Sequence, residues 1–359
     1  MDASPLDIGG LTAAQLDAAA LVRLPRGAGR SREIYRQCMR QARFEPEELG
    51  LGAAAIAAWR EQFRLDLPEV VSLATEPFDL DNEHTAKAVL RSRDGLEYEC
   101  VRIPMGRGRL TLCVSSQVGC KMGCAFCETG RMGLLRNLSA AEIVSQVLVA
   151  RHVLGWPIRN IVFMGMGEAL DNWQQLRQAL MILTDRPGLG LSQERITVCT
   201  VGHLDGIRKL RALGWRRLGL SISLNAANDQ LRNKLMPMNR RCSLAALQAE
   251  LVAYRPRDNF AFGVNYCLMP GINDHAGAEH EIAAFCEPLG RCLANVIPYN
   301  PGSQAITQAP EDDAVVAFTE RLRAAGCAVR RRITKGRSVM AACGQLGNAG
   351  LRRCLQERL

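Results

Sequence analysis

The sequence has no long hydrophobic run, no export signal and few aromatic residues. Its 359 residues contain no uninterrupted apolar stretch of about 18, the length that a membrane-spanning helix needs. The first residues, Met1–Pro5, lack the basic segment, apolar run and small-residue cleavage site of a secretory signal. We therefore expect a cytoplasmic protein without a membrane partner. Aromatic residues make up only 5% of the chain, so a stacking surface for bases is not indicated.

The sequence does have the composition of an ordinary globular protein, with a surplus of arginine and many cysteines. Apolar residues account for 48% and charged residues for 23%, which is enough to form a sizeable core. The formal net charge of +9 is a weak indication of a polyanionic partner, and a basic surface without a partner explains it equally well. In a reducing compartment, 14 cysteines indicate metal or thiol chemistry for some and core packing for the others.

The first 95 residues differ in pattern from the rest. Segments 11–22, 32–43 and 54–65 are rich in alanine or arginine and have apolar residues at helical spacing. Segment 66–83 contains two prolines and no clear period, which is typical of a connector. We predict a small N-terminal helical accessory domain over residues 1–95, with RNA contact as its candidate role.

After this region, short β-branched runs alternate with helical segments. Residues 95–103 and 109–116 are separated by a turn and predict a hairpin that leads into the main domain. The strand at 110–115 is the first of six, and the other five are expected at 160–164, 195–201, 218–224, 262–268 and 293–298. The helices are expected at 140–154, 173–184, 205–213, 244–254, 276–287 and 312–325.

This alternation predicts an α/β fold with a parallel sheet. Six strands are fewer than the eight of a closed barrel, so we expect an open or partial barrel over residues 96–345, followed by a short tail, 346–359. In such folds the reactive residues lie on loops at the C-terminal ends of the strands.

Three cysteines follow the first of these strands at the spacing C-x3-C-x2-C. Cys120, Cys124 and Cys127 lie in a glycine-containing loop and could hold three irons of a cuboidal iron–sulfur cluster. The fourth iron would then be open, and an open position is typical of a reactive rather than a structural metal centre. Structural zinc is the alternative, but it needs four ligands and no second Cys/His pair of suitable spacing stands nearby.

The cluster motif belongs to a wider resemblance. Phe126 directly precedes the third cysteine, Leu112–Cys120 reads LCVSSQVGC, and Ala341–Leu346 reads AACGQL. Together these motifs resemble the RlmN/Cfr family of radical S-adenosylmethionine (radical SAM) adenosine RNA methyltransferases, over most of the chain between Glu97 and Leu346. The resemblance implies a partial (βα)6 barrel whose three loop cysteines hold a 4Fe-4S cluster that binds S-adenosyl-L-methionine (SAM).

The resemblance also implies residues that bind SAM. Gly165–Glu168 matches the family's glycine-rich segment that recognises the amino end of SAM, although a lone Gly-x-Gly is more typical of a tight turn. Cys199 stands where the family usually has serine, and Asn225 where it usually has histidine. The implied cofactor-binding residues are Gly167, Glu168, Cys199, Ser223, Leu224, Asn225 and Asn300.

In the mechanism that the resemblance implies, Cys343 takes a methyl group from one SAM. A second SAM is cleaved at the cluster and supplies the radical that activates this methyl group for addition to adenine. Cys113 then releases the product by forming a disulfide with Cys343, and Glu99 accepts the ring proton. An electron donor for the cluster and a thiol reductant follow as partners. From the residues alone, the two cysteines read as small core positions and Glu99 as a solvated charge.

Basic residues occur on several predicted loops and element ends. They could neutralise RNA phosphates, although each taken singly is more typical of a solvated face. They are Arg131, Arg136, Arg208, Lys209, Arg216, Arg217, Arg240, Arg241, Arg330–Arg332, Lys335 and Arg337.

We therefore expect a monomeric enzyme that methylates C2 or C8 of an adenosine in 23S ribosomal RNA, with transfer RNA as a further candidate. One alternative is a radical SAM enzyme of another reaction type, such as a methylthiotransferase or an activase. The other is a non-catalytic zinc-containing RNA-binding module.

Overall fold

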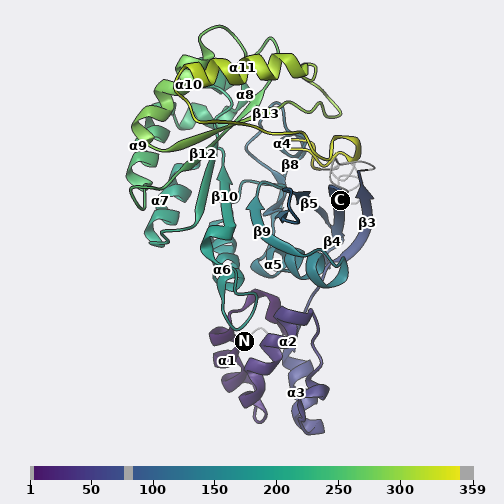
Figure 1. Cartoon of the computed structure of the whole chain (residues 1–359). Coiled ribbons are helices and arrows are strands. Elements are labelled where there is room, and N and C mark those ends of the chain that lie inside the picture. The colour runs from purple at the N-terminus through teal and green to yellow at the C-terminus, as the bar shows by residue number, and fades with distance from the viewer. Residues whose placement is uncertain (1–3, 77–83, 348–359) are drawn as a thin grey trace.

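The computed structural model describes residues 4–76 and 84–347, in which three N-terminal helices lie beneath a large sheet that further helices cover (Figure 1). The helices are α1 (Ala13–Arg23), α2 (Ser31–Gln41), α3 (Ala53–Gln62), α4 (Glu128–Met132), α5 (Ala140–Leu148), α6 (Trp173–Thr184), α7 (Leu204–Ala212), α8 (Asp229–Leu235), α9 (Leu244–Tyr254), α10 (Ala278–Cys286) and α11 (Asp312–Ala324). The strands are β1 (Leu6–Asp7), β2 (Phe63–Arg64), β3 (Glu69–Thr75), β4 (Ala86–Arg91), β5 (Glu97–Pro104), β6 (Leu110–Cys113), β7 (Gln117–Cys120), β8 (Gly133–Asn137), β9 (Ile158–Phe163), β10 (Ile196–Thr200), β11 (Gly219–Ser223), β12 (Phe262–Leu268), β13 (Cys292–Pro298) and β14 (Val329–Arg331).

Ten strands of the described residues form one sheet in the order β14-β13-β12-β11-β10-β9-β6-β5-β4-β3. Neighbours from β6 to β14 run parallel, whereas β3, β4, β5 and β6 pair antiparallel. Within the described residues β3 and β14 do not pair with each other, so the barrel is open. The parallel part brings the C-terminal ends of its strands to one edge of the sheet.

Capping residues fix the starts of two of the predicted helices. Ser139 caps α5, and its hydroxyl and the side chain of Glu142 form a capping box. Ser243 caps α9 by accepting a hydrogen bond from the backbone N–H of Ala246. These caps explain why the predicted starts at 140 and 244 coincide with the observed ones.

The N-terminal helices have an apolar centre around Trp59 and dock on the end of α6. The backbone N–H of Ala13 donates to the carboxylate of Asp185 at 2.7 Å, and Nε of Arg40 donates to the carbonyl of Gly188 at 3.2 Å. The helical part is therefore anchored to the turn that follows α6.

Most predicted elements are confirmed. The six predicted parallel strands, the six predicted helices after residue 139 and the hairpin of β5 and β6 are all present, with boundaries shifted by a few residues. The strand β14 and the helix α8 were not predicted. The connector predicted at 66–83 is wrong for residues 69–75, which form β3 because β4 offers them a pairing edge. Of the predicted tail, 346–359, only the first two residues lie within the described part. No helix in the described part combines the length and hydrophobicity needed to cross a bilayer.

Candidate active site

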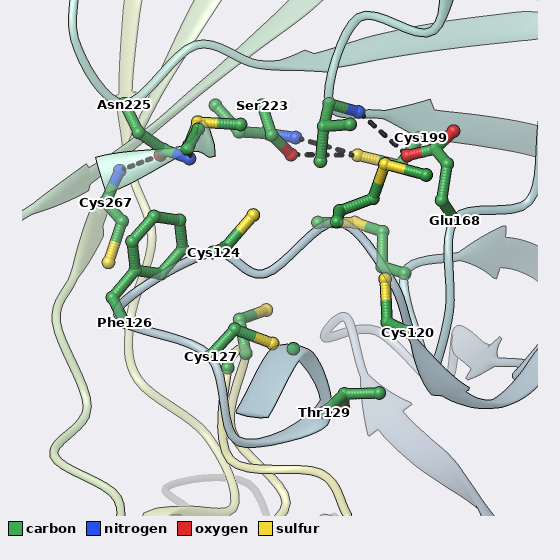
Figure 2. Close-up of a pocket in the computed structure, with 18 of the residues that line it drawn as sticks. Cys120, Cys124, Phe126, Cys127, Thr129, Glu168, Cys199, Ser223, Asn225 and Cys267 are labelled. Carbon is green, nitrogen blue, oxygen red and sulfur yellow. Dashed lines mark hydrogen bonds between the residues drawn. The ribbon is translucent and has the colours of Figure 1, made fainter. Parts of the chain in front are cut away.

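The C-terminal ends of the parallel strands surround one pocket, as expected for a partial barrel. It encloses about 940 Å³ and receives residues from the loop after β7, from the ends of β9 to β13 and from the segment around Cys343 (Figure 2). The predicted site residues that line it are Cys120, Cys124, Cys127, Gly167, Glu168, Cys199, Ser223, Asn225 and Cys343. Cys113, Glu99, Leu224 and Asn300 lie outside this lining.

The three-cysteine loop runs from β7 to α4. Gly119 has φ +78°, and a Cβ there would lie 1.9 Å from the carbonyl oxygen of Gly133, so this turn requires glycine. The backbone N–H of Ala125 donates to the carbonyl of Leu235 at 2.9 Å and holds the loop against α8. Figure 2 shows the sulfur atoms of the three cysteines around a common open space.

The chemistry of these thiols fits an iron–sulfur cluster. Burial raises the pKa of all three thiols, that of Cys120 to about 12, so without a metal they stay protonated at neutral pH. Iron supplies the positive charge that converts such thiols into thiolate ligands. No three His, Cys, Asp or Glu side chains of the described residues stand close enough to hold a single metal ion. Three thiols around a wider space suit a cuboidal cluster better than one four-coordinate zinc ion.

The loop after β9 lies very close to the loop after β6. A Cβ on Gly165 would lie 2.6 Å from the carbonyl oxygen of Val114, and a Cβ on Gly167, which has φ +96°, would lie 2.5 Å from Cβ of Gln117. The backbone N–H of Glu168 donates to Oε1 of Gln117 at 2.9 Å. Close approach therefore requires both glycines, and it places Glu168 at the pocket wall.

Glu168 is a buried carboxyl group with a raised pKa. Burial raises the pKa to about 7, although the backbone N–H groups of Val201 and Leu170 donate to the carboxylate at 2.9 and 3.2 Å and oppose the rise. A hydrogen-bond donor that enters the pocket beside Glu168 would favour its ionised form. This behaviour suits a group that recognises an amino function.

Cys199 occupies its position as a neutral thiol. Its Sγ lies 3.6 Å from Oγ of Ser223 and accepts a hydrogen bond from Nδ2 of Asn265 at 3.3 Å (Figure 2). Burial raises the pKa of this thiol to about 12. Cys199 thus keeps the hydrogen-bonding place of the serine that is usual in the resembling family, with a weaker acceptor atom.

Asn225 and Leu224 close the end of β11. Asn225 has φ +58°, a left-handed conformation that asparagine adopts more readily than most residues, and its Oδ1 accepts a hydrogen bond from the backbone N–H of Cys267 at 2.9 Å. Leu224 is fully buried, and its carbonyl accepts a hydrogen bond from Arg232 at 3.0 Å. Leu224 therefore supports the strand end and leaves the pocket wall to its neighbours.

Asn300 lies just beyond β13 and is buried beside the pocket. Its Nδ2 donates to the carbonyl of Pro298 at 3.1 Å, and its Oδ1 accepts from Nε of Arg337 at 3.0 Å. In this structure the side chain is therefore engaged with the chain itself.

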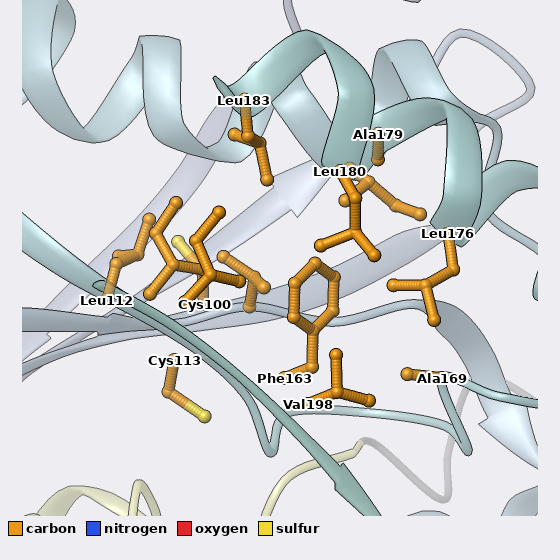
Figure 3. Packing of buried hydrophobic residues seen from close by; sticks show 14 of the residues in the cluster. Cys100, Leu112, Cys113, Phe163, Ala169, Leu176, Ala179, Leu180, Leu183 and Val198 are labelled. Atoms are coloured by element: carbon orange, nitrogen blue, oxygen red, sulfur yellow. The ribbon is translucent and has the colours of Figure 1, made fainter. Parts of the chain in front are cut away.

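Cys113 and Cys343 come together from distant parts of the sequence. Cys113 ends β6 and points to the opposite side of the sheet from Leu112, at the border of the apolar core (Figure 3). Burial first, and the nearby Cys343 thiol second, raise the pKa of Cys113 well above its usual value. Cys343 is exposed and lines the pocket. The surrounding protein raises the pKa of its thiol, whereas Arg332 acts to lower it.

Glu99 lies on β5, behind the segment that carries Cys343. It is 7% exposed and forms an ion pair with Nζ of Lys87 at 3.2 Å. The backbone N–H of Gly347 donates to its Oε2 at 3.0 Å. Glu99 is thus tied to the residues that follow Cys343 rather than to the pocket lining.

Residues 341–347 are held on the end of the cluster loop. The backbone N–H of Glu128 donates to the carbonyl of Gly344 at 2.8 Å, and the hydroxyl of Thr129 donates to the carbonyl of Leu346. Since both donors directly follow Cys127, these bonds fix the position of Cys343 relative to the cluster site.

Several residues of the site were not predicted from the sequence, among them two on β12 and a buried arginine. Asn265 and Cys267 line the pocket from β12, and Arg232 lies behind it. An asparagine inside the apolar run FGVNYCL was a signal for Asn265, because a buried amide needs a partner. Cys267 and Arg232 gave no such signal.

Comparisons with known proteins agree with this geometry. Residues 114–280 match the family model described as Radical SAM superfamily. A probable dual-specificity RNA methyltransferase RlmN 1 from Protochlamydia amoebophila is 45% identical over 275 residues, which cover 77% of this chain and 76% of that protein. The dual-specificity RNA methyltransferase RlmN from Phenylobacterium zucineum is 36% identical, covering 95% of this chain and 90% of that protein.

A solved structure extends the similarity to the fold. The crystal structure of a radical SAM methyltransferase from Sphaerobacter thermophilus matches with a TM-score of 0.87 and 34% identity, over 95% of this chain and 99% of that chain. Both the sequence and the fold therefore assign the protein, and the chain belongs to the RlmN family of radical SAM RNA methyltransferases.

Proposed function

We propose that this enzyme methylates an sp2 ring carbon, C2 or C8, of an adenosine in 23S ribosomal RNA, with transfer RNA as an additional substrate, through a methyl group carried on Cys343. The observation that carries the proposal is the attachment of the Cys343 segment to the cluster loop and to β5, next to the strand of Cys113, together with the electrostatic interaction of the two thiols. A ring carbon of adenine is electrophilic and does not attack the methyl sulfonium of SAM directly. The methyl group therefore has to reach the ring by another route, here by way of a carrier thiol. The names of the relatives support RNA as the substrate.

The cofactors are assigned to the residues that surround the pocket. Cys120, Cys124 and Cys127 would hold the 4Fe-4S cluster, which when bound supplies the single electron that splits SAM. The proposed SAM contacts are Gly167, Glu168, Cys199, Ser223, Leu224, Asn225 and Asn300. The contact of Asn300 requires its hydrogen bond to Arg337 to be exchanged.

The two thiols would act in sequence. The Cys343 thiolate forms a bond to the methyl carbon while the carbon–sulfonium bond of SAM breaks, and S-adenosylhomocysteine leaves. After the carbon has been joined to adenine, the adduct would pass the ring proton to Glu99 and return one electron to the cluster site, and the Cys113 thiolate then attacks the sulfur of Cys343. The C–S bond breaks, the released carbon takes up a proton to become the methyl group, and a Cys113–Cys343 disulfide remains. A cellular thiol reductant reopens this disulfide with two electrons.

The remaining proposals concern the location, oligomeric state, domains and electron donor of the enzyme. We propose a cytoplasmic monomer in which the helical part of residues 1–95 is an accessory RNA-contacting domain. Residues 96–345, together with β3 and β4 of the same sheet, form the catalytic domain. An external electron donor reduces the cluster. The docking of Ala13 and Arg40 on the turn after α6 supports a fixed position of the accessory helices.

The experiment is mass spectrometry of nucleosides from the ribosomal and transfer RNA of a strain that lacks the gene. Complementation with the wild-type gene should restore 2-methyladenosine or 8-methyladenosine, whereas Cys343→Ala should restore neither. Cys286→Ala, a buried cysteine outside the pocket, is the matched control and should restore the wild-type level. If neither nucleoside depends on the gene, the proposed reaction is wrong.

The two alternatives lead to different outcomes. A methylthiotransferase or an activase has no use for a carrier thiol, so Cys343→Ala would leave its activity intact. A zinc-containing RNA-binding module would purify colourless, with zinc and without iron. The proposed enzyme should purify anaerobically as a brown protein that contains iron and sulfide.

A further inference from the structure

Arg232 is the one buried lysine or arginine among residues 4–76 and 84–347. It lies in the middle of α8 with 0% of its surface exposed. Burying a guanidinium away from water is costly unless its charge is compensated, and the usual compensation is a carboxylate.

All hydrogen-bond acceptors of Arg232 are neutral. Its Nε donates to the carbonyl of Leu224 at 3.0 Å, and Nη2 donates to the carbonyls of Val201 and Ser223 at 2.6 and 3.2 Å. Its Nη1 donates to Oδ1 of Asn239 at 2.6 Å. No Asp or Glu of the described chain forms an ion pair with it, so the hydrogen bonds are satisfied while the charge is not.

The nearest carboxylate on the same helix is engaged elsewhere. Oδ1 of Asp229 accepts hydrogen bonds from Nδ2 of Asn239 at 2.7 Å and from the backbone N–H of Leu244 at 2.9 Å. Asp229 therefore shapes the turn after α8 instead of pairing with Arg232.

The cluster loop lies next to this unpaired charge. The carbonyl of Leu235, at the end of α8, accepts a hydrogen bond from Ala125, which directly follows Cys124. Burial lowers the pKa of Arg232 to about 10, and Cys124 is the first group that opposes this effect. Because Arg232 and Cys124 are both buried, they interact more strongly than exposed charges at a similar separation.

We propose that Arg232 is a positioning residue that raises the reduction potential of the cluster by placing a buried positive charge behind Cys124. The proposal rests on the cluster site under "Proposed function" and goes beyond it. Reduction adds one electron from a low-potential donor, without a proton and without a change in bonding, so the reduced cluster is more negative by one charge. A fixed positive charge favours that state. The same side chain links the ends of β10 and β11, where Val201 and Ser223 line the pocket.

The test is a redox titration of the reconstituted enzyme with dithionite in the absence of SAM, followed by electron paramagnetic resonance. At a fixed applied potential, the ratio of reduced to oxidised cluster should be about tenfold lower in Arg232→Gln than in the wild type. This corresponds to a reduction potential about 59 mV lower. Arg232→Lys keeps the charge and should stay within about threefold of the wild type. Arg241→Gln, an exposed arginine on the turn after α8, is the matched control and should leave the potential unchanged.

A second variant keeps the proposal testable if Arg232→Gln fails to fold. Asn239→Asp leaves Arg232 in place and gives it a carboxylate partner where Asn239 now accepts its hydrogen bond at 2.6 Å. The carboxylate offsets the positive charge, so the reduction potential of the cluster should also fall in this variant. If Arg232→Gln and Asn239→Asp fold, contain the cluster and show the reduction potential of the wild type, the proposed role of Arg232 is wrong. The proposed function would still stand. A wild-type enzyme that assembles no cluster under the same conditions would overturn both.

Discussion

Cys199 accepts a hydrogen bond from Asn265 and lies beside Ser223, while the carboxyl of Glu168 stands on the same pocket wall. Cys199 and Glu168 are both buried, and burial raises the pKa of the thiol to about 12 and that of the carboxyl to about 7. The pocket can therefore exist without a ligand and without a buried negative charge at this wall. A ligand that brings a hydrogen-bond donor to Glu168 favours the ionised form of this carboxyl group.

Glu168 predicts a pH dependence of stability in the apoprotein. Its pKa is about 7 in the folded protein against 4.5 without burial, so the folded state retains a proton that the unfolded state loses between these pH values. The free energy of unfolding therefore falls as pH rises through this window, and the loss is complete above it. Relative to Glu168→Gln, the wild type should lose on the order of 2–3 kcal/mol between pH 5 and pH 8.

Urea unfolding of both apoproteins at the two pH values measures this difference, with exposed Glu311→Gln as the control. SAM binding should be weaker in Glu168→Gln at pH 8, because the amide offers a poorer acceptor to an amino group. If the two apoproteins show the same pH dependence, Glu168 is ionised throughout and the argument from its burial is wrong.

At the scale of elements, the sequence predicts those segments that have a clear period of their own. The strands β9 to β13 are apolar runs and their helices carry caps, so local signals and the fold agree. By contrast, α8 is short and polar, and β14 reads VRR, so each depends on a neighbouring element to form. The strand β3 is predicted as a connector for the same reason.

The residues of the site also differ in whether a local sequence signal predicts them. The spacing of Cys120, Cys124 and Cys127 is local and is visible in one line of sequence. The proximity of Cys113 and Cys343 depends on β6 and the segment 341–347 being brought together, and only the family resemblance suggested it. An arginine in a polar helix reads as solvated, so the burial of Arg232 could not be predicted.

The attachment of residues 341–347 to α4 leads to a prediction about this segment. Thr129→Val keeps the shape of the side chain but removes the hydroxyl that donates to the carbonyl of Leu346. A lost hydrogen bond with an unsatisfied buried partner costs about 1–2 kcal/mol. Hydrogen exchange of the peptide that contains Cys343 should therefore become about 5- to 30-fold faster, and the methylation rate should fall with it.

Thr184→Val is the matched control, because it removes a hydroxyl that donates to the carbonyl of Leu180 within α6, away from the pocket. It should leave exchange in residues 341–347 unchanged. Equal exchange rates in the wild type and Thr129→Val would show that other contacts hold this segment in place.

At the scale of the whole molecule, the net charge of +9 is unevenly compensated. Four arginines of the N-terminal part form ion pairs with carboxylates, as in the pair of Arg60 with Glu47 at 2.7 Å. They are Arg30, Arg43, Arg60 and Arg64. Several exposed arginines of the barrel form no ion pair within the described residues, among them Arg216, Arg240, Arg241 and Arg330, and the same holds for Arg26, Arg32 and Arg36 of the N-terminal part. The four unpaired arginines of the barrel should attract RNA phosphates more strongly than the four paired ones.

Two quadruple variants separate the effect of unpaired arginines from the effect of net charge. Replacing Arg216, Arg240, Arg241 and Arg330 by glutamine lowers the net charge by four, and so does replacing the four paired arginines. The first variant should bind RNA more weakly, and its slope of log K against log salt should become shallower by about 1 for each arginine that contacts a phosphate. The second should keep a slope close to that of the wild type, because the charges it removes are already offset by neighbouring carboxylates. Filter binding across a salt series measures both slopes, and an equal decrease in the two variants would show that net charge, rather than pairing, controls the attraction.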